Sequence, residues 1–183
     1  MSKRVLVPLA DGFEEIEAIT PIDVLRRAGA DVTVASVRGL SVKGSHGITV
    51  QAEMTLGDCA TMEFDLIVLP GGMPGAAHLA ESGMLCEMLK KHHENNRPLA
   101  AICAAPAVVL NPLGLLGKER VSCYPSFRAK LDDANRTEER ICVGDGLVTA
   151  AGPGVAMEFA LALVELLVSR EKAEELAKAM VVK

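Results

Sequence analysis

Three short apolar runs without polar alternation constrain the fold of this chain more than any other feature. They are Arg4–Leu9, Asp65–Leu69 and Leu99–Ile102. A strand with one face in water alternates apolar with polar residues, whereas a strand covered on both faces does not. We therefore expect these runs to be strands of a buried, largely parallel sheet.

Segments with helical periodicity separate the expected strands. Helices are expected over Glu14–Ala28, Leu79–Asn95, Val155–Ser169 and Glu171–Met180. Strands that alternate with helices predict an α/β fold in which helices cover both faces of the sheet. The chain has no internal repeat and no long linker, so residues 1–183 are expected to form one domain.

Composition and charge narrow the possible functions. The formal net charge is −5 and the sequence pI is near 5.4, which argues against general affinity for nucleic acid or anionic membranes. No segment resembles a signal peptide or a membrane span. The five cysteines are scattered, no CxxC occurs, and no cysteine–histidine pair has zinc-site spacing. We therefore expect a cytoplasmic protein with free thiols and no bound metal.

Three loops are expected to meet at one edge of the sheet. Parallel strands bring their carboxyl ends together, and ligands of such sheets bind at that edge. The segments Ala10–Glu17 and Gly71–Gly75 and the bend at Cys103 each follow an expected strand. These loops define the candidate site.

Cys103 lies where an apolar strand breaks into a helical segment that has Pro106 in its first turn. A thiol at such a junction meets unpaired backbone N–H groups and the positive end of the helix dipole. Both favour the thiolate. The local pattern leaves open the alternative of a small buried hydrophobic side chain, which is what most free cysteines are.

Gly71 and Gly72 follow a buried strand, and their N–H groups can approach a developing oxyanion because no side chain blocks them. A tight turn without a ligand is the alternative. The loop lacks the Lys-Ser/Thr pair of a phosphate-binding loop and is not a dinucleotide fingerprint. No nucleotide cofactor is therefore expected.

A carboxyl group is a better candidate partner for the thiol than a histidine. Glu14, Glu15 and Glu17 open the first expected helix, where acidic residues commonly interact with the helix dipole. One of them beside Cys103 would hydrogen-bond the sulfur or act as a base. No spacing brings any of the four histidines to Cys103, and Ala104 directly follows it. A cysteine–histidine peptidase is therefore disfavoured.

Five segments occur in a fixed order along the chain. They are Ala10-Asp-Gly-Phe-Glu-Glu-Ile-Glu17, Asp23-Val-Leu-Arg-Arg-Ala-Gly29, Val68-Leu-Pro-Gly-Gly-Met-Pro-Gly75, Ala100-Ala-Ile-Cys-Ala-Ala-Pro106 and Gly152-Pro-Gly154. Together they resemble the ThiJ/PfpI superfamily, in the branch of the parkinsonism-linked protein deglycase and the bacterial YajL-like proteins. The similarity extends from about Lys3 to the last expected helix.

The resemblance implies a flavodoxin-like three-layer sandwich that forms a homodimer and works without a cofactor. It assigns Cys103 as the nucleophile on a strained elbow and Glu17 as the carboxyl that hydrogen-bonds it. It gives the backbone N–H groups of Gly72 and Ala104 the role of an oxyanion site. The remaining residues expected around the pocket are Gly71, Tyr124, Arg27, His46 and Pro153.

Two positions depart from the pattern of relatives. Tyr124 stands where many relatives have a histidine, and a phenol is a poorer proton shuttle than an imidazole near neutral pH. Proton transfer through Glu17 is therefore favoured. His46 stands where some relatives have an arginine that, with Arg27, holds an anion. A histidine there is expected to carry charge only at mildly acidic pH.

We therefore expect an enzyme that acts on reactive carbonyls. The leading interpretation is a cofactor-independent glyoxalase and deglycase that acts on methylglyoxal, glyoxal and their early adducts on amines or thiols. Such an activity would protect against carbonyl and oxidative stress. The alternative is a redox sensor and chaperone whose Cys103 is oxidised to a sulfinate that Glu17 stabilises. A protein–protein interaction module with an inert cysteine is the third interpretation.

Overall fold

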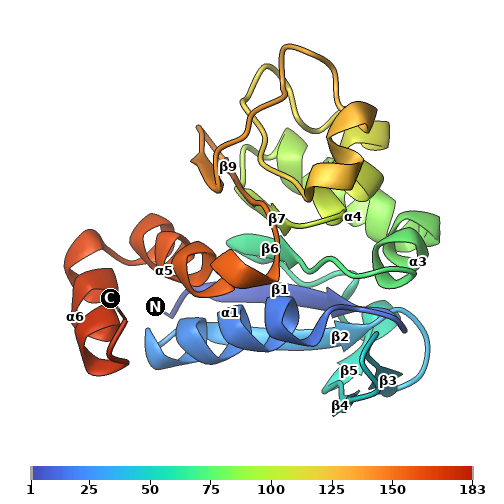
Figure 1. Cartoon of the computed structure of the whole chain (residues 1–183). Helices are drawn as coiled ribbons and strands as arrows, with labels where there is room; N and C mark the ends of the chain where they lie inside the picture. Colours follow the sequence, from blue (N-terminus) through green and yellow to red (C-terminus); the bar gives the residue numbers. More distant parts are fainter. Residues whose placement is uncertain (1, 183) are drawn as a thin grey trace.

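A computed structural model of the chain describes residues 2–182 and contains a seven-stranded sheet (Figure 1). Its strands are β1 (Arg4–Leu9), β2 (Asp31–Ser36), β5 (Met54–Thr55), β6 (Leu66–Leu69), β7 (Leu99–Ile102), β8 (Ile141–Val143) and β9 (Leu147–Ala150). They lie in the order β5-β2-β1-β6-β7-β9-β8, and all neighbours are parallel except β9 and β8. A separate antiparallel hairpin joins β3 (Ser41–Lys43) to β4 (Thr49–Gln51).

Helices lie on both faces of the sheet. They are α1 (Glu15–Arg27), α2 (Leu56–Cys59), α3 (Gly75–Glu81), α4 (Gly83–Glu94), α5 (Ala156–Leu167) and α6 (Arg170–Ala179). The helices α1 and α5 pack together on one face with α6 beside α5, while α3 and α4 lie on the other (Figure 1). The predicted α/β fold is confirmed. Between residues 2 and 182, no helix has the length and apolar character needed to cross a membrane.

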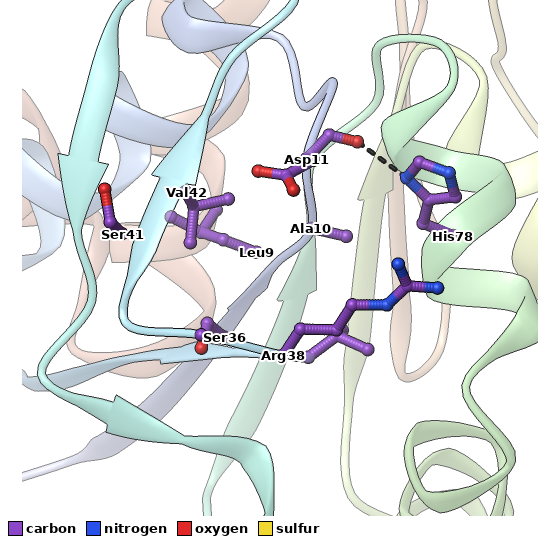
Figure 2. A pocket seen from close by; sticks show the side chains of 10 residues that line it. Leu9, Ala10, Asp11, Ser36, Arg38, Ser41, Val42 and His78 are labelled. Atoms are coloured by element: carbon purple, nitrogen blue, oxygen red, sulfur yellow. Dashed lines mark hydrogen bonds between the residues drawn. The ribbon is translucent and has the colours of Figure 1, made fainter.

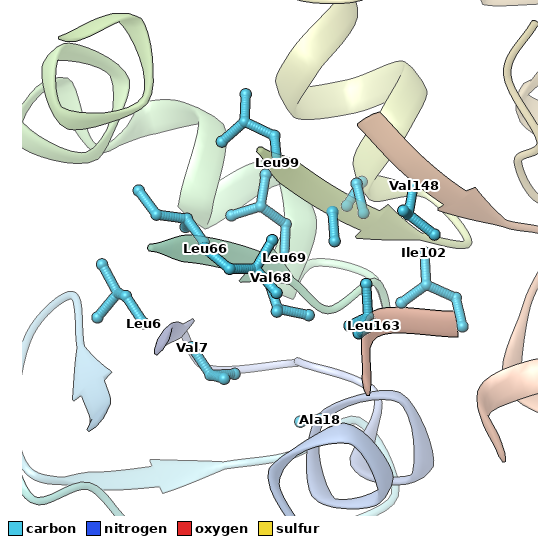
Figure 3. Packing of buried hydrophobic residues seen from close by; sticks show 14 of the residues in the cluster. Leu6, Val7, Ala18, Leu66, Val68, Leu69, Leu99, Ile102, Val148 and Leu163 are labelled. Atoms are coloured by element: carbon cyan, nitrogen blue, oxygen red, sulfur yellow. The ribbon is translucent and has the colours of Figure 1, made fainter. Parts of the chain in front are cut away.

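The central strands are buried because helices cover both of their faces. Every residue of β6 and of β7 is buried, which explains why these runs lack polar alternation. Figure 3 shows Leu66 and Val68 of β6 in one cluster with Val7 of β1 and Leu163 of α5. Burying each such side chain stabilises the fold by about 1.5–3 kcal/mol. The loops at the carboxyl edge therefore project from a rigid sheet.

Two expected helices differ from the structure. The segment predicted as one helix over Leu79–Asn95 is two, because the Ser82 hydroxyl accepts a hydrogen bond from the N–H of Leu85 (3.3 Å) and starts α4. The segment after Cys103 is not an α-helix: Pro106–Leu110 forms a π-helical turn, which continues into a 3₁₀ turn at Asn111–Leu113. Because this segment is short and irregular, its dipole at Cys103 is weaker than expected.

The strand order places the switch point of the sheet between β1 and β6. From β1 the chain proceeds outward through β2 to β5, and it then returns to the other side of β1 as β6, β7 and β9. Loops that leave β1 and β6 diverge at such a point and form a crevice at the carboxyl edge. The loop after β1, the loop after β6 and the bend after β7 adjoin this position.

Candidate functional site

Cys103 is held in a bend directly after β7. Its φ is +64°, a left-handed conformation that is uncommon for a residue with a side chain and costs roughly 1–3 kcal/mol. Its N–H donates to the carbonyl of Ala150 (2.9 Å), and its carbonyl accepts from the N–H of Tyr124 (2.9 Å). Contacts on both sides thus fix the bend. The side chain is only 8% exposed.

Glu17 is fully buried in the first turn of α1, although carboxylates rarely lie in protein interiors. Its Oε2 accepts a hydrogen bond from the N–H of Gly71 (2.9 Å). Its Oε1 has no hydrogen-bond partner between residues 2 and 182. The neighbouring acid–base group is the Cys103 thiol, which interacts directly with the carboxyl. Oε1 is therefore the carboxyl oxygen that no other group of the described chain occupies.

The site requires glycine at positions 71 and 72. A Cβ atom at Gly71 would lie 2.6 Å from Oε2 of Glu17 and 2.7 Å from Cβ of Cys103, which is too close. Gly72 has a φ of +87°, and a Cβ there would lie 2.4 Å from the backbone nitrogen of Glu14. These glycines therefore allow the loop after β6 to pass directly between the loop after β1 and Cys103.

The backbone N–H groups of Gly72 and Ala104 lower the pKa of the Cys103 thiol and so favour its thiolate. These are the two groups to which the family resemblance gives the role of an oxyanion site. Their role towards a substrate oxygen stays a prediction. Their position is suitable, because an oxygen that develops charge beside the sulfur lies within reach of the same donors.

Burial and charge oppose the thiolate more strongly than these donors favour it. Burial raises the pKa of the Cys103 thiol, and the Glu17 carboxylate raises it further, to about 12. Burial also raises the pKa of the Glu17 carboxyl to about 7, against hydrogen bonds from Cys103 and Gly71. The backbone donors at the bend lower the pKa of the thiol, as the sequence predicts, but burial and the Glu17 carboxylate outweigh them. Protonation of Glu17 removes its repulsion of the sulfur and therefore lowers the cost of forming the thiolate, while the cost of burial remains.

His46 interacts with Glu15 at the start of α1. Its Nδ1 lies 3.0 Å from Oε2 of Glu15, and its N–H donates to Oε1 (2.8 Å). These contacts raise the pKa of His46. Glu15 and Glu14 both stabilise the imidazolium, so His46 takes up a proton at a higher pH than a free histidine does. The ring pairs with these carboxylates, and its contacts within the chain do not include Cys103.

Glu14, Glu15 and His46 also form the group of potential metal ligands that occurs between residues 2 and 182. One ligand atom from each of Glu14, Glu15 and His46 lies within 4.8 Å of the others. Both oxygens of Glu15 already accept hydrogen bonds from the turn that contains His46. The cluster is therefore satisfied by contacts within the chain.

The structure places some of the other predicted pocket residues near Cys103 and others away from it. The backbone of Tyr124 lies against Cys103, and its partly exposed ring lies beside Gly152, next to the partly buried Pro153. Arg27 lies near the last turn of α1 and pairs with Asp23 (2.9 Å). Ten residues of helix separate it from Glu17, or about 15 Å. Within one chain, the prediction of Arg27 in the pocket is therefore wrong.

Glu14 is a site residue whose particular role the sequence does not reveal. Its Oε2 accepts from the N–H of Glu17 (3.1 Å), and its own N–H donates to the carbonyl of Gly71 (2.9 Å). Its charge also raises the pKa of Glu17. The available signal was a carboxylate three residues before another at a helix start, which is a capping spacing.

Known proteins resemble this chain over nearly its whole length. The DJ-1/PfpI family profile matches residues 3–166. Protein DJ-1 homolog B of Arabidopsis thaliana is 46% identical over 180 residues, which are 98% of this chain and 41% of that protein. The chain thus spans less than half the length of that relative.

Two further relatives match along most of their own length. Glutathione-independent glyoxalase DJR-1.2 of Caenorhabditis elegans is 36% identical over 179 residues, which are 97% of this chain and 94% of that protein. The solved structure of oxidized Toxoplasma gondii DJ-1 is 44% identical, covers 98% of each chain and superposes with a TM-score of 0.97. Both fold and sequence are therefore shared with these proteins.

Proposed function

The chain belongs to the DJ-1/PfpI family, and on that premise we propose that it is a cofactor-independent glyoxalase that converts methylglyoxal to lactate. The observation that carries the proposal is the buried pair of Cys103 and Glu17, whose carboxyl has a pKa of about 7. A carboxyl with that value can both give and take a proton at neutral pH. The glyoxalase name of the Caenorhabditis relative supports the same chemistry.

The first step joins the substrate to Cys103. With the proton on Glu17, the thiolate attacks the aldehyde carbon and a carbon–sulfur bond forms. The electron pair of the carbonyl moves to oxygen, which takes the proton from Glu17. The product is a hemithioacetal, and the N–H groups of Gly72 and Ala104 are the donors available to the oxygen while it carries charge.

The second step moves a hydrogen between two carbons. The Glu17 carboxylate removes the proton from the carbon that bears sulfur, which gives an enediol, and returns a proton to the neighbouring carbon. The result is a lactyl thioester on Cys103. Water then hydrolyses the thioester, so methylglyoxal and one water become lactate and the thiol is restored. Glyoxal gives glycolate by the same steps.

The same site is proposed to act on early glycation adducts. A hemithioacetal or a hemiaminal of methylglyoxal retains the carbon that Cys103 attacks, with a thiol or an amine as the leaving group. Attack by the Cys103 thiolate would form the carbon–sulfur bond and break the bond to that group, which leaves as the neutral thiol or amine with the proton from Glu17, and the same enzyme-bound intermediate results. Loss of a purified adduct faster than its spontaneous dissociation would separate this activity from scavenging of free aldehyde.

The experiment measures methylglyoxal loss and lactate formation by the wild type, Cys103→Ser and Glu17→Ala. Each variant is expected to lose at least about 100-fold in kcat/KM, since each removes a group that the chemistry requires. Cys86→Ser is the matched control, because Cys86 is the partly exposed cysteine on α4, outside the site. Turnover that is unchanged in both site variants would refute the proposal.

A second candidate function is redox sensing by oxidation of Cys103 to a sulfinate. It is favoured by the oxidized state of the Toxoplasma relative and by the protonated Glu17, which can donate a hydrogen bond to a sulfinate oxygen. Peptide mapping after limiting peroxide should find the sulfinate at Cys103 rather than at the more accessible Cys86. Equal oxidation of both cysteines would exclude a selective sensor.

We also propose that two copies associate through an apolar patch formed by Ile16, Ile19 and Ile48. These side chains are 53%, 40% and 59% exposed. The N–H of Ile48 donates to Oε1 of Glu15 (3.3 Å), so the segment before β4 lies against the start of α1. Exposed apolar side chains on neighbouring segments commonly mark an interface, and a homodimer buries one patch against its copy.

A further inference from the structure

The two sides of Cys103 along the edge of the sheet differ. β7 lies between β6 and β9, and on the β6 side Gly71 and Glu17 lie directly against the cysteine. Beyond β6, a hollow at the ends of β1 and β2 has the charged residues Asp11 and Arg38 in its lining, which does not include Cys103 (Figure 2). Contacts that a larger substrate makes beyond the sulfur are therefore expected on the side of β9.

Tyr124 presents an aromatic ring on that side. Its N–H donates to the carbonyl of Cys103 (2.9 Å), and the N–H of Cys103 donates to the carbonyl of Ala150 at the end of β9 (2.9 Å). The ring lies on Gly152, since a Cβ atom there would be 3.2 Å from Cδ2 and 3.8 Å from Cε2 of Tyr124. Tyr124 is 44% exposed, although Cys103 is only 8% exposed. The loop after β9 therefore supports the ring, and the rest of the ring stays accessible beside the bend.

The charges at the site favour an uncharged substrate. The charged group that acts on Cys103 is the carboxyl of Glu17, and the carboxylate of Glu14 acts on Glu17 in turn. The two cationic side chains expected at the pocket, Arg27 and His46, pair with other carboxylates. A negatively charged substituent would therefore be repelled, whereas an uncharged aromatic substituent can pack on an exposed ring.

We propose that Tyr124 determines substrate specificity, and that its ring selects uncharged 2-oxoaldehydes with an aromatic substituent, such as phenylglyoxal. This inference rests on the proposed glyoxalase function, whose steps convert phenylglyoxal and one water to mandelate. With the aldehyde carbon on Cys103, the substituent extends towards β9 and packs on the Tyr124 ring. Two aromatic rings in offset or edge-to-face contact attract each other beyond the burial of their surfaces. The contact is the same in the substrate and in the transition state, so it acts through KM.

The test compares turnover of phenylglyoxal and methylglyoxal by the full chain and its variants. Tyr124→Leu, which keeps an apolar side chain without a ring, should lower the ratio of kcat/KM for phenylglyoxal to that for methylglyoxal about three- to tenfold, mainly through KM. Tyr124→Phe should keep the wild-type ratio, because the ring and not the hydroxyl makes the contact. Phe64→Leu removes a buried ring just before β6, at the opposite edge of the sheet, and is the matched control that should also keep the ratio. An unchanged ratio in Tyr124→Leu, or an equal fall in Tyr124→Phe, would overturn the proposal.

Binding to Cys103→Ser distinguishes failure of this inference from failure of the proposed function. Tyr124 is the single tyrosine of the chain, so its ring signals in an NMR spectrum are unambiguous. The uncharged ketol 2-hydroxyacetophenone should shift these signals saturably, whereas hydroxyacetone, with a methyl group in place of the phenyl ring, should not at the same concentration. Saturable shifts without any turnover by the wild type would refute the glyoxalase and support the ring contact. Turnover of methylglyoxal without such shifts would refute the ring contact alone.

Discussion

At the scale of single residues, the site depends on one negative charge shared by Cys103 and Glu17. The carboxylate raises the pKa of the thiol, while a neutral Glu17 removes that repulsion and can donate a hydrogen bond to the sulfur. Burial contributes most to the raised pKa of the thiol, and the charge state of Glu17 sets how much higher it rises. A reactive thiol needs Glu17 to be neutral, whereas turnover of a substrate also needs Glu17 to carry a proton between carbons.

Glu17→Gln should separate those two demands. The amide is neutral at every pH, so the pKa of Cys103 should fall and its alkylation by iodoacetamide at pH 7 should become several-fold faster. Lactate formation should be lost, because an amide cannot carry a proton between carbons. Alkylation rates between pH 5 and 10 and a glyoxalase assay give both results. Slower alkylation in Glu17→Gln would show that the carboxylate assists the thiolate rather than opposing it.

Gly71 is the residue whose replacement should damage the pair most directly. A methyl group at this position would meet Oε2 of Glu17 and Cβ of Cys103, and neither backbone can move without breaking its own hydrogen bonds. Gly71→Ala should therefore lower the free energy of unfolding by at least about 2 kcal/mol and abolish lactate formation.

The control for that substitution is Gly83→Ala, the same change where a Cβ atom has nothing within 4 Å. Gly83 lies in the first turn of α4, so alanine there should be neutral or stabilising by up to about 1 kcal/mol. Denaturant unfolding of both variants measures the difference. A Gly71→Ala protein as stable as the control would show that the loop can relax around the added methyl group.

At the scale of elements, the first turn of α1 is attached to the turn between β3 and β4 through Glu15. Burial alone would raise the pKa of this carboxyl, but hydrogen bonds from the His46 ring and from the N–H groups of His46 and Ile48 lower it to about 2. The unfolded chain takes up a proton near the ordinary value of 4.5, which the folded protein resists until about 2. The attachment therefore stabilises the fold above pH 4.5 and is lost as the pH falls towards 2.

Glu15→Gln should make the free energy of unfolding depend less on pH between about 2 and 4.5. The variant should be less stable than the wild type at pH 6, and the difference should shrink as the pH falls from about 4.5 towards 2, where the wild-type carboxyl is also neutral. Urea unfolding at several pH values measures it. Glu81→Gln, an exposed carboxyl on α3, should leave the profile unchanged. A constant difference across this pH range would show that Glu15 acts by packing rather than by charge.

The elements themselves show what sequence patterns can and cannot predict. The sequence predicts β1, β6 and β7 because a strand buried on both faces is a run without polar residues. The π-helical form of the turn at Pro106–Leu110 has no such sequence pattern, since it depends on packing after the bend. Cys103, Glu17 and Gly72 come from separate loops that parallel strands bring to one edge. Motif order could nominate them, whereas the link from His46 to Glu15 spans 31 residues and has no local pattern.

At the scale of the whole molecule, the site lies where the strand order reverses, and three loops contribute to it. The Glu17 carboxyl lies on α1, and the outer side of the same helix carries Ile16 and Ile19 of the proposed dimer patch. The turn that holds Glu15 also places Ile48 in that patch. Association would therefore bury the elements that support Glu17 and stabilise the site through α1.

Sedimentation at micromolar concentration tests the assembly. The wild type should sediment at about twice 19.3 kDa, and Ile19→Glu should sediment near 19.3 kDa, because a buried unpaired carboxylate at the centre of the patch opposes association. Val143→Glu is the matched control, since Val143 is 64% exposed on the edge strand β8, away from α1.

If the patch supports the site, Ile19→Glu should also lose lactate formation at dilute concentrations where the wild type remains active. A wild type that sediments as a monomer would refute the dimer, and a fully active monomeric Ile19→Glu would show that each chain completes its own site.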